Sequence, residues 1–369
     1  MGFFRILLVP FALLYGLAVW VRNALFDIGV LPSEQFEVPV ISIGNLRTGG
    51  TGKTPHVEYL VRLLKNQYNV AVLSRGYKRK SRGFVVAGPE TSCKDIGDEP
   101  CQMYNKFPDI VVAVHEKRSK GIKRILEVFP ETNLVILDDA FQHRYVKPGL
   151  NLLLTGYFNP FFDDFLLPVG NLREGKRRVR RADALIVTKT PTIFSPLDRR
   201  YFLKKLKKYK QPHVYFSAFQ YKKLAPLNDK AKSFSAKSLK SIFLLTGIAN
   251  SVALEEYLKT ISKDLYVHKY RDHHQFTYKD LEKIRSHFKK TISYSKVIVI
   301  TEKDAMRLQD AKLQECLKEI PVFVLPVEVQ FHGSDQKDFN DLVYRFLKKT
   351  KKQGTKACPL SESYQSNFC

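Results

Sequence analysis

The feature that most constrains the fold is a glycine-rich loop between a short apolar run and an amphipathic segment. VPVISIG (38–44) is apolar and ends in glycine, as short buried strands do. The loop NLRTGGTGKTP (45–55) follows, and the segment 53–66 then repeats apolar residues at the spacing of one helix face. This order of strand, loop and helix is the context in which backbone N–H groups and a helix N-terminus bind phosphate groups.

The residues of this loop predict a site for a nucleoside triphosphate. Lys53 is placed to reach the β- and γ-phosphates, and the hydroxyl of Thr54 is placed to hold Mg²⁺. A strict phosphate-loop motif would have glycine at position 47, where this chain has Arg47. The alternative is a glycine-rich turn that only caps a helix, which the GKT sequence disfavours. The predicted nucleotide-binding residues are Thr48, Gly49, Gly50, Thr51, Gly52, Lys53 and Thr54.

A pair of carboxylates supplies the second half of such a site. LVILDDAFQHR (134–144) contains an apolar run that ends in Asp138 and Asp139, and one or both are expected to coordinate Mg²⁺, directly or through water. The alternative is that these carboxylates cap a turn. Guanine recognition would need an Asn/Thr-Lys-x-Asp segment. TKTP (188–191) lacks the aspartate and TEKD (301–304) has the wrong spacing, so ATP is preferred to GTP.

Apolar strands and amphipathic helices alternate along most of the chain. This pattern predicts an α/β fold, with a P-loop NTPase-like parallel sheet domain and a second, smaller α/β domain. A cleft between two such domains is a usual place for a site. The predicted division is a hydrophobic membrane-associated helix (1–30), the P-loop domain (31–212), a linker with a strand (213–240), the smaller α/β domain (241–350) and a polar tail (351–369).

The N-terminal segment predicts contact with a membrane. The 16 residues between Arg5 and Arg22 carry no charge, which as a helix is short for a bilayer core of about 30 Å. Tyr15 and Trp20 punctuate the run as interfacial anchors do. We therefore expect a helix that lies in or dips into the membrane. A true span and a helix buried against its own domain are the alternatives, and a signal peptide is disfavoured because a small-residue cleavage site is missing.

The charge of the chain predicts a polyanionic partner. It has 61 Lys and Arg against 36 Asp and Glu, a formal net charge of +25. Such an excess indicates nucleic acid, an anionic membrane surface or a phosphorylated substrate, and the densest basic runs are 176–181 and 203–210. The five cysteines are scattered and have no zinc spacing, so we expect reduced thiols in a cytosolic compartment rather than a disulfide framework.

With these motifs in order, the chain resembles the tetraacyldisaccharide 4′-kinase family, the lipid A 4′-kinases of outer-membrane-bearing bacteria. The resemblance runs from the N-terminus to about residue 330. It rests on ISIGNLRTGGTGKTP (41–55), LSRGYKR (73–79), GDEP (97–100), LDDAFQHR (137–144), LPVGNLRE (167–174), LTGIAN (245–250), RDHHQF (271–276) and TEKDA (301–305). Ala140, where the family commonly has glycine, and Asn171 are small departures that remove no group with proposed chemistry.

The resemblance implies an enzyme that uses ATP and Mg²⁺ to phosphorylate the 4′-hydroxyl of a tetraacylated glucosamine disaccharide 1-phosphate. The implied location is the cytoplasmic face of the bacterial inner membrane. Asp98 would accept the hydroxyl proton and His273 would orient that carboxylate, with Lys53 acting on the transferring phosphate. Because Asp98 precedes the linker and His273 follows it, we expect them to come from different lobes. Further candidates are Arg75, Arg118 and Arg173 for phosphate charge, Gln142 and His143 on the metal side, and Glu174.

The implied partners are the lipid A precursor and anionic inner-membrane lipids, and no nucleic acid is expected. The alternative function is a P-loop ATPase that binds nucleic acid through its basic surface. That function would need aromatic stacking platforms or a basic recognition helix, whereas the aromatic residues here are spread through core-like strands and the N-terminal segment. A membrane-anchored scaffold with a dead site is disfavoured because Lys53, Thr54, Asp138 and Asp139 are all present.

Overall fold

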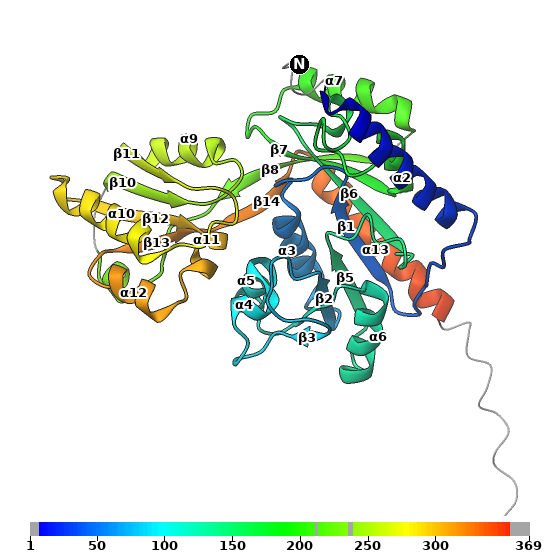
Figure 1. Ribbon diagram of the computed structural model, residues 1–369, viewed down its shortest axis with the longest axis horizontal. Helices are drawn as coiled ribbons and strands as arrows, with labels where there is room; N and C mark the ends of the chain where they lie inside the picture. Colours follow the sequence, from blue (N-terminus) through cyan, green and yellow to red (C-terminus); the bar gives the residue numbers. More distant parts are fainter. Residues whose placement is uncertain (1–6, 211–212, 235–238, 355–369) are drawn as a thin grey trace, which may run out of the picture.

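The larger domain is built on a mixed, mainly parallel sheet. The computed structural model describes residues 7–210, 213–234 and 239–354, and within them this sheet has nine strands in the order β14-β8-β7-β6-β1-β5-β2-β4-β3 (Figure 1). Only the edge strands β14 and β3 run antiparallel to their neighbours. The strands are β1 (Val40–Asn45), β2 (Val70–Ser74), β3 (Val85–Val86), β4 (Val111–Val114), β5 (Leu134–Asp138), β6 (Leu150–Gly156), β7 (Ala184–Thr190), β8 (Val214–Tyr221) and β14 (Val327–Phe331).

Helices cover both faces of this sheet, which explains why its central strands read as continuous apolar runs. Strands β1, β2 and β5 are buried along their whole length. The predicted helix after the phosphate loop is confirmed, and it buries the expected apolar face: Val57, Leu60, Val61 and Leu64. The helical elements are α3 (Lys53–Leu64), α4 (Cys93–Ile96), α5 (Asp98–Lys106), η1 (Phe161–Asp163), α6 (Arg118–Val128), η2 (Lys176–Arg181), α7 (Pro196–Leu206), η3 (Lys207–Tyr209) and α13 (Asp335–Gly354).

The smaller domain has its own sheet and its own hydrophobic core, as predicted. Among the described residues its sheet has five strands in the order β11-β10-β12-β13-β9. The strands are β9 (Ala225–Pro226), β10 (Leu239–Thr246), β11 (Ser262–Lys269), β12 (Lys296–Thr301) and β13 (Val322–Leu325). Its helices are α8 (Asp229–Lys232), α9 (Val252–Ile261), α10 (Tyr278–Lys290), α11 (Glu302–Arg307) and α12 (Ala311–Leu317).

The sheet topology divides the chain differently from the sequence-based boundaries. Strand β8, placed in the linker 213–240, pairs with β7 of the larger sheet. Strand β14 and helix α13, placed in the smaller domain 241–350, return to the larger domain, where β14 pairs with β8 (Figure 1). The chain therefore crosses between the domains twice. Helix α13 ends at Gly354, and the rest of the predicted tail lies outside the described residues.

The predicted N-terminal helix is present as α2 (Val9–Asp27), which is 19 residues long and apolar enough to cross a membrane by length and composition. Most of its large apolar side chains are exposed, with Leu13 at 69% and Leu14 at 65%. The helix lies against the larger domain, away from the smaller one (Figure 1). Arg5, expected as an anchor, lies outside the described residues.

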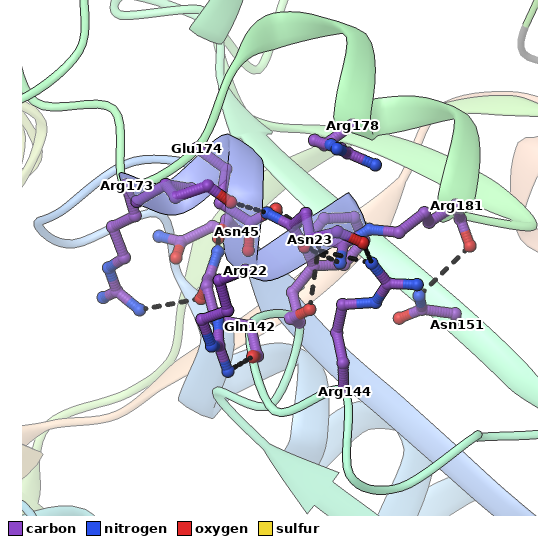
Figure 2. A network of polar contacts seen from close by, with 12 residues as sticks. Arg22, Asn23, Asn45, Gln142, Arg144, Asn151, Arg173, Glu174, Arg178 and Arg181 are labelled. Carbon is purple, nitrogen blue, oxygen red and sulfur yellow. Dashed lines mark hydrogen bonds and ion pairs between the residues drawn. The ribbon is translucent and has the colours of Figure 1, made fainter. Parts of the chain in front are cut away.

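The polar side of α2 is joined to the larger domain by a hydrogen-bond network (Figure 2). Asn23 is buried, and its side-chain oxygen accepts from Arg144 (3.2 Å) and Arg181 (3.3 Å). Arg22 donates to the carbonyl of Gln142 at 3.1 Å, and the hydroxyl of Tyr15 donates to the carbonyl of Arg173 at 2.9 Å. The helix is thus attached to its domain through polar contacts while its apolar face stays free.

The expectation that all cysteines are reduced needs correction. Cys93 and Cys101 form a disulfide between α4 and α5, with their Cα atoms 5.2 Å apart. Gly97 joins the end of α4 to the start of α5, and the turn there brings the two cysteines together. The spacing of the cysteines in the sequence did not predict this contact. Cys316 is free and buried, and Cys358 and Cys369 lie outside the described residues.

We predict that Asn23→Leu destabilises the protein while leaving α2 apolar. The substitution leaves Arg144 and Arg181 without the amide oxygen they share, a loss that costs about 1–3 kcal/mol for a buried polar contact. The melting temperature in detergent should fall by several degrees. Leu14→Asn, at an exposed position of the same helix, is the control and should melt close to wild type. Equal melting temperatures for Asn23→Leu and wild type would contradict the role of this network.

Candidate active site

Side chains from neighbouring strands hold the phosphate loop in shape. At the end of β1, Asn45 Nδ2 donates to Thr51 Oγ1 at 2.8 Å. Gln142 Nε2 donates to the carbonyl of Asn45 at 2.8 Å, and Thr188 Oγ1, from β7, donates to the carbonyl of Thr51 at 2.8 Å. The loop conformation is therefore fixed by the protein before any nucleotide binds.

Gly52 is the last residue of the loop and the N-cap of α3, and the backbone conformation there requires glycine. Its φ is +84°, in the left-handed region. A Cβ at this position would lie 2.7 Å from the ring of Phe219, which packs under the loop. Lys53 and Thr54 follow as the first two residues of α3, at the positive end of the helix.

Asp139 balances two of the predicted cations. Lys53 Nζ lies 3.5 Å from one oxygen of Asp139, and Arg173 lies 3.1 Å from the other. Burial raises the pKa of Asp139, but Lys53 and Arg173 outweigh it, and the pKa lies below its ordinary value. Arg173 also donates to Oε1 of Gln142 at 3.2 Å. The structure thus brings four predicted site residues into one cluster at the loop.

Asp138 lies at the end of β5 in a different environment. Burial and the charges of Glu99 and Asp139 together raise its pKa to about 7, although the charges of Lys53 and Arg118 act in the opposite direction. Its Oδ1 is buried and has no hydrogen-bond partner among the described residues. Within residues 7–210, 213–234 and 239–354, no group of three or more His, Cys, Asp or Glu side chains could hold a metal ion. An ion at Asp138 therefore needs further oxygen ligands from a bound phosphate or from water.

Asp98 and His273 meet across the two domains, as expected from their positions in the sequence. Asp98 begins α5, and His273 Nδ1 lies 3.6 Å from its Oδ2. Burial raises the pKa of Asp98, but hydrogen bonds from His273 and Arg307 outweigh it, so the pKa lies below its ordinary value. His273 has a φ of +61°, and its ring contacts the ring of Tyr77 edge to face, with 5.1 Å between ring centroids.

Two basic residues of α11 complete this pair from the smaller domain. Arg307 Nε donates to Asp98 Oδ2 at 2.7 Å, while its Nη1 donates to Asp304 at 2.9 Å. The Arg307 side chain is fully buried, so its charge depends on these carboxylates. Lys303 Nζ donates to Nε2 of His273 at 3.1 Å, which leaves Nδ1 to carry the proton that faces Asp98.

Of the remaining candidates, Arg75, Arg118 and His143 lie near Asp138 and Asp139, whereas Glu174 lies under α2. Arg118 is buried beneath the carboxylates and donates to the backbone carbonyl of Asp138 at 3.2 Å. Its charge and that of Arg75 lie near His143, where burial lowers the pKa of the imidazole to about 4, so the ring is neutral. Glu174 is buried and pairs with Arg181 at 2.6 Å in the network under α2, so it has a structural contact rather than a place at the loop (Figure 2).

Sequence reasoning missed three basic residues near the predicted site: Lys303 contacts His273, Arg307 contacts Asp98, and Lys189 lies beside Gly50. Lys303 and Arg307 are four residues apart in TEKDAMR and so share a face of α11. That spacing is a signal that could have found them. Lys189 follows a buried strand in TKTP, a segment considered only for guanine recognition.

Comparisons with known proteins agree with this geometry. A model of the tetraacyldisaccharide-1-P 4′-kinase family matches residues 4–348. The tetraacyldisaccharide 4′-kinase of Phocaeicola vulgatus is 44% identical over 347 residues, which cover 93% of this chain and 95% of that protein. The corresponding protein of Bacteroides thetaiotaomicron is 45% identical over 353 residues, which cover 92% of this chain and 93% of that protein.

A solved structure extends the likeness to three dimensions. LpxK from Aquifex aeolicus in complex with ATP matches with a TM-score of 0.69 at 30% sequence identity, covering 93% of this chain and 99% of that chain. The resemblance read from the sequence motifs is confirmed, and so is the P-loop α/β fold. The chain belongs to the tetraacyldisaccharide-1-P 4′-kinase family.

Proposed function

We propose that this chain transfers the γ-phosphate of ATP to the 4′-hydroxyl of a tetraacyldisaccharide 1-phosphate, a lipid A precursor, and so forms the 1,4′-bisphosphate. The observation that carries the mechanism is the Asp98–His273 pair between the two domains. Glu99, the next residue after Asp98, lies close enough to Asp138 for its charge to raise the pKa of Asp138. The start of α5, which carries Asp98, therefore lies near the carboxylate that we expect beside the phosphates.

Asp98 acts as the base in this proposal. As the 4′-oxygen forms its bond to the γ-phosphorus, the bond from that phosphorus to the β–γ bridging oxygen breaks, and the hydroxyl proton passes to Asp98. The lowered pKa of Asp98 keeps it ionised at neutral pH. His273 donates its Nδ1 proton toward Asp98 and so orients the carboxylate, while Lys303 fixes the imidazole tautomer.

The residues at the loop fit Mg²⁺, which we propose as the cofactor together with ATP. Oδ1 of Asp138 is buried and has no hydrogen-bond partner among the described residues, so it is free to coordinate the ion. Thr54 and Asp139 would supply the other protein ligands. Bound Mg²⁺ would neutralise charge on the β- and γ-phosphates. Lys53 contributes a fixed positive charge at the same place, already oriented by Asp139.

The exposed apolar side of α2 supports a place at the membrane. Acyl chains leave a bilayer at a cost of about 0.8 kcal/mol per CH₂, so an enzyme acting on this substrate gains from working at the surface. We propose that α2 inserts its apolar face, and that the basic runs 176–181 and 203–210 contact anionic lipids at the cytoplasmic face of the inner membrane. In this proposal the large positive charge of the chain binds anionic lipid headgroups and the phosphates of the substrates rather than nucleic acid.

A double-mutant cycle tests the Asp98–His273 pair. Asp98→Asn keeps the shape but removes the proton acceptor, so kcat should fall by about 10²–10⁴ with little change in ATP affinity. His273→Ala should cost a comparable factor, and the double variant little more than the worse single one, because the groups act together. Asp109→Asn, an exposed carboxylate paired with Lys65, is the control and should leave kcat unchanged. Multiplicative losses would show that the two residues act independently.

The pH profile of kcat tests the contact between Arg307 and Asp98. The base must be deprotonated, so activity falls as the pH drops through the pKa of Asp98. Arg307→Met removes a cation that lowers this pKa while the burial that raises it remains, so the acidic limb should move to higher pH. Arg307→Lys keeps the charge and should keep the limb near wild type.

Arg199→Met, which breaks the ion pair with Asp335 elsewhere in the larger domain, is the matched control. It also breaks an arginine–carboxylate ion pair, at a more exposed position, and should leave the limb in place. An unshifted limb in Arg307→Met, with kcat still measurable, would refute the contribution of Arg307 to the base.

A further inference from the structure

Lys189 lies at an irregular point of β7, next to the phosphate loop. The pairing of β7 with β8 shifts register between Val187 and Thr190, and Lys189 has a φ of +57°. Such a bulge re-aims a side chain at the end of a strand, and a positive φ is unusual for a residue other than glycine. The adjacent Thr188 is hydrogen-bonded to the carbonyl of Thr51, so this part of β7 is fixed to the loop.

The ammonium group of Lys189 is directed at the glycines of that loop. A Cβ built on Gly50 would lie 3.8 Å from Lys189 Nζ, so the charge lies beside the loop backbone. The same Nζ lies 5.4 Å from the centroid of the Phe219 ring, the ring that packs against Gly52. The aromatic face thus supports the side chain from below and leaves its charge facing the loop.

Among the described residues, no carboxylate is in direct contact with this cation. In the parts of the chain that the structure describes, no carboxylate lies within 4.0 Å of Lys189 Nζ, and no hydrogen bond from it is found. Burial lowers the pKa of Lys189, the distant Asp272 raises it, and the charges of Lys303 and Lys53 lower it. Three lysines therefore lie near one another, and only Lys53 and Lys303 have carboxylates in contact.

A partly buried ammonium close to two other cations is unfavourable unless an anion occupies the space between them. The nearest predicted anion is the phosphate chain of a nucleotide bound by residues 48–54. We propose that Lys189 is a second lysine of the nucleotide site, and that its ammonium contacts the phosphate chain of bound ATP. This inference rests on the proposed function, since it assumes that the loop binds ATP.

The lipid substrate also carries a phosphate, so its 1-phosphate is a second anion that could contact the ammonium group of Lys189. The position of Lys189 over Gly50 favours the nucleotide. The two sources predict different kinetics: a contact with ATP affects the Kd for ATP, whereas a contact with the lipid phosphate affects the KM for the lipid alone.

Calorimetric titration with ATP in the presence of Mg²⁺ tests the proposal. Lys189→Met keeps about the same side-chain length but removes the charge. It should raise the Kd for ATP about tenfold or more, which is the usual effect on affinity of losing a hydrogen bond to a charged group. The Kd for adenosine should not change. Lys189→Arg should bind ATP within a few-fold of wild type. Lys259→Met, which removes an exposed lysine of α9, is the control and should leave both constants unchanged.

A second measurement uses the wild-type protein and does not depend on how the variants fold. Lys189 should be acylated by an amine-reactive reagent in free protein and protected when ATP is bound, as measured by mass spectrometry, while the exposed Lys259 reacts equally in both states. Unchanged ATP affinity in Lys189→Met, a raised KM for the lipid alone, or no protection of Lys189 would each overturn the inference. Absence of ATP binding by the wild-type protein would instead overturn the proposed function.

Discussion

The site depends on one topological constraint: the central strands of the larger sheet are parallel, so their carboxyl ends meet at one edge. Strand β1 ends there in Asn45 and the phosphate loop, and β5 ends there in Asp138. Strand β7, two places along the sheet, ends beside the same loop and holds it through Thr188. Residues far apart in sequence thus reach one place without long side chains, and a nucleotide site at this edge follows from the order of the strands.

The second domain contributes what the sheet edge lacks. The edge supplies cations and the carboxylates proposed to bind Mg²⁺, but the proposed base, Asp98, needs partners that hold it ionised. Arg307 is buried without solvent to stabilise its charge, and its contact with Asp98 gives each of the two charges an opposite partner. The same contact joins the two domains, so the ion pair that lowers the pKa of Asp98 also lies where the domains meet. Chain crossings at β8 and β14 keep the domains in reach of each other (Figure 1).

Local patterns predicted the local parts of this structure. Glycine-rich spacing and the apolar face of 53–64 were enough for the loop and α3, because each depends on neighbouring residues, and the alternation of apolar strands with helices was enough for the fold class. The resemblance to a family supplied the pairing of Asp98 with His273, which spacing could not. The direction of Glu174 was not predictable, because residues 173 and 174 lie in a bend whose contacts come from distant parts of the chain: Arg173 pairs with Asp139 at the loop, and Glu174 pairs with Arg181 under α2. Strand β14 was assigned to the wrong domain because an edge strand carries no signal for the sheet it joins.

The central claim is that the two domains assemble a phosphotransferase for a lipid-linked sugar hydroxyl. The most direct measurement supplies ATP labelled in its γ-phosphate and a tetraacyldisaccharide 1-phosphate in detergent, and then locates the label in the product. The account predicts label on the 4′-oxygen in wild type, with transfer strongly reduced in Asp98→Asn. Label that appears only as inorganic phosphate, or at another position of the sugar, would contradict it.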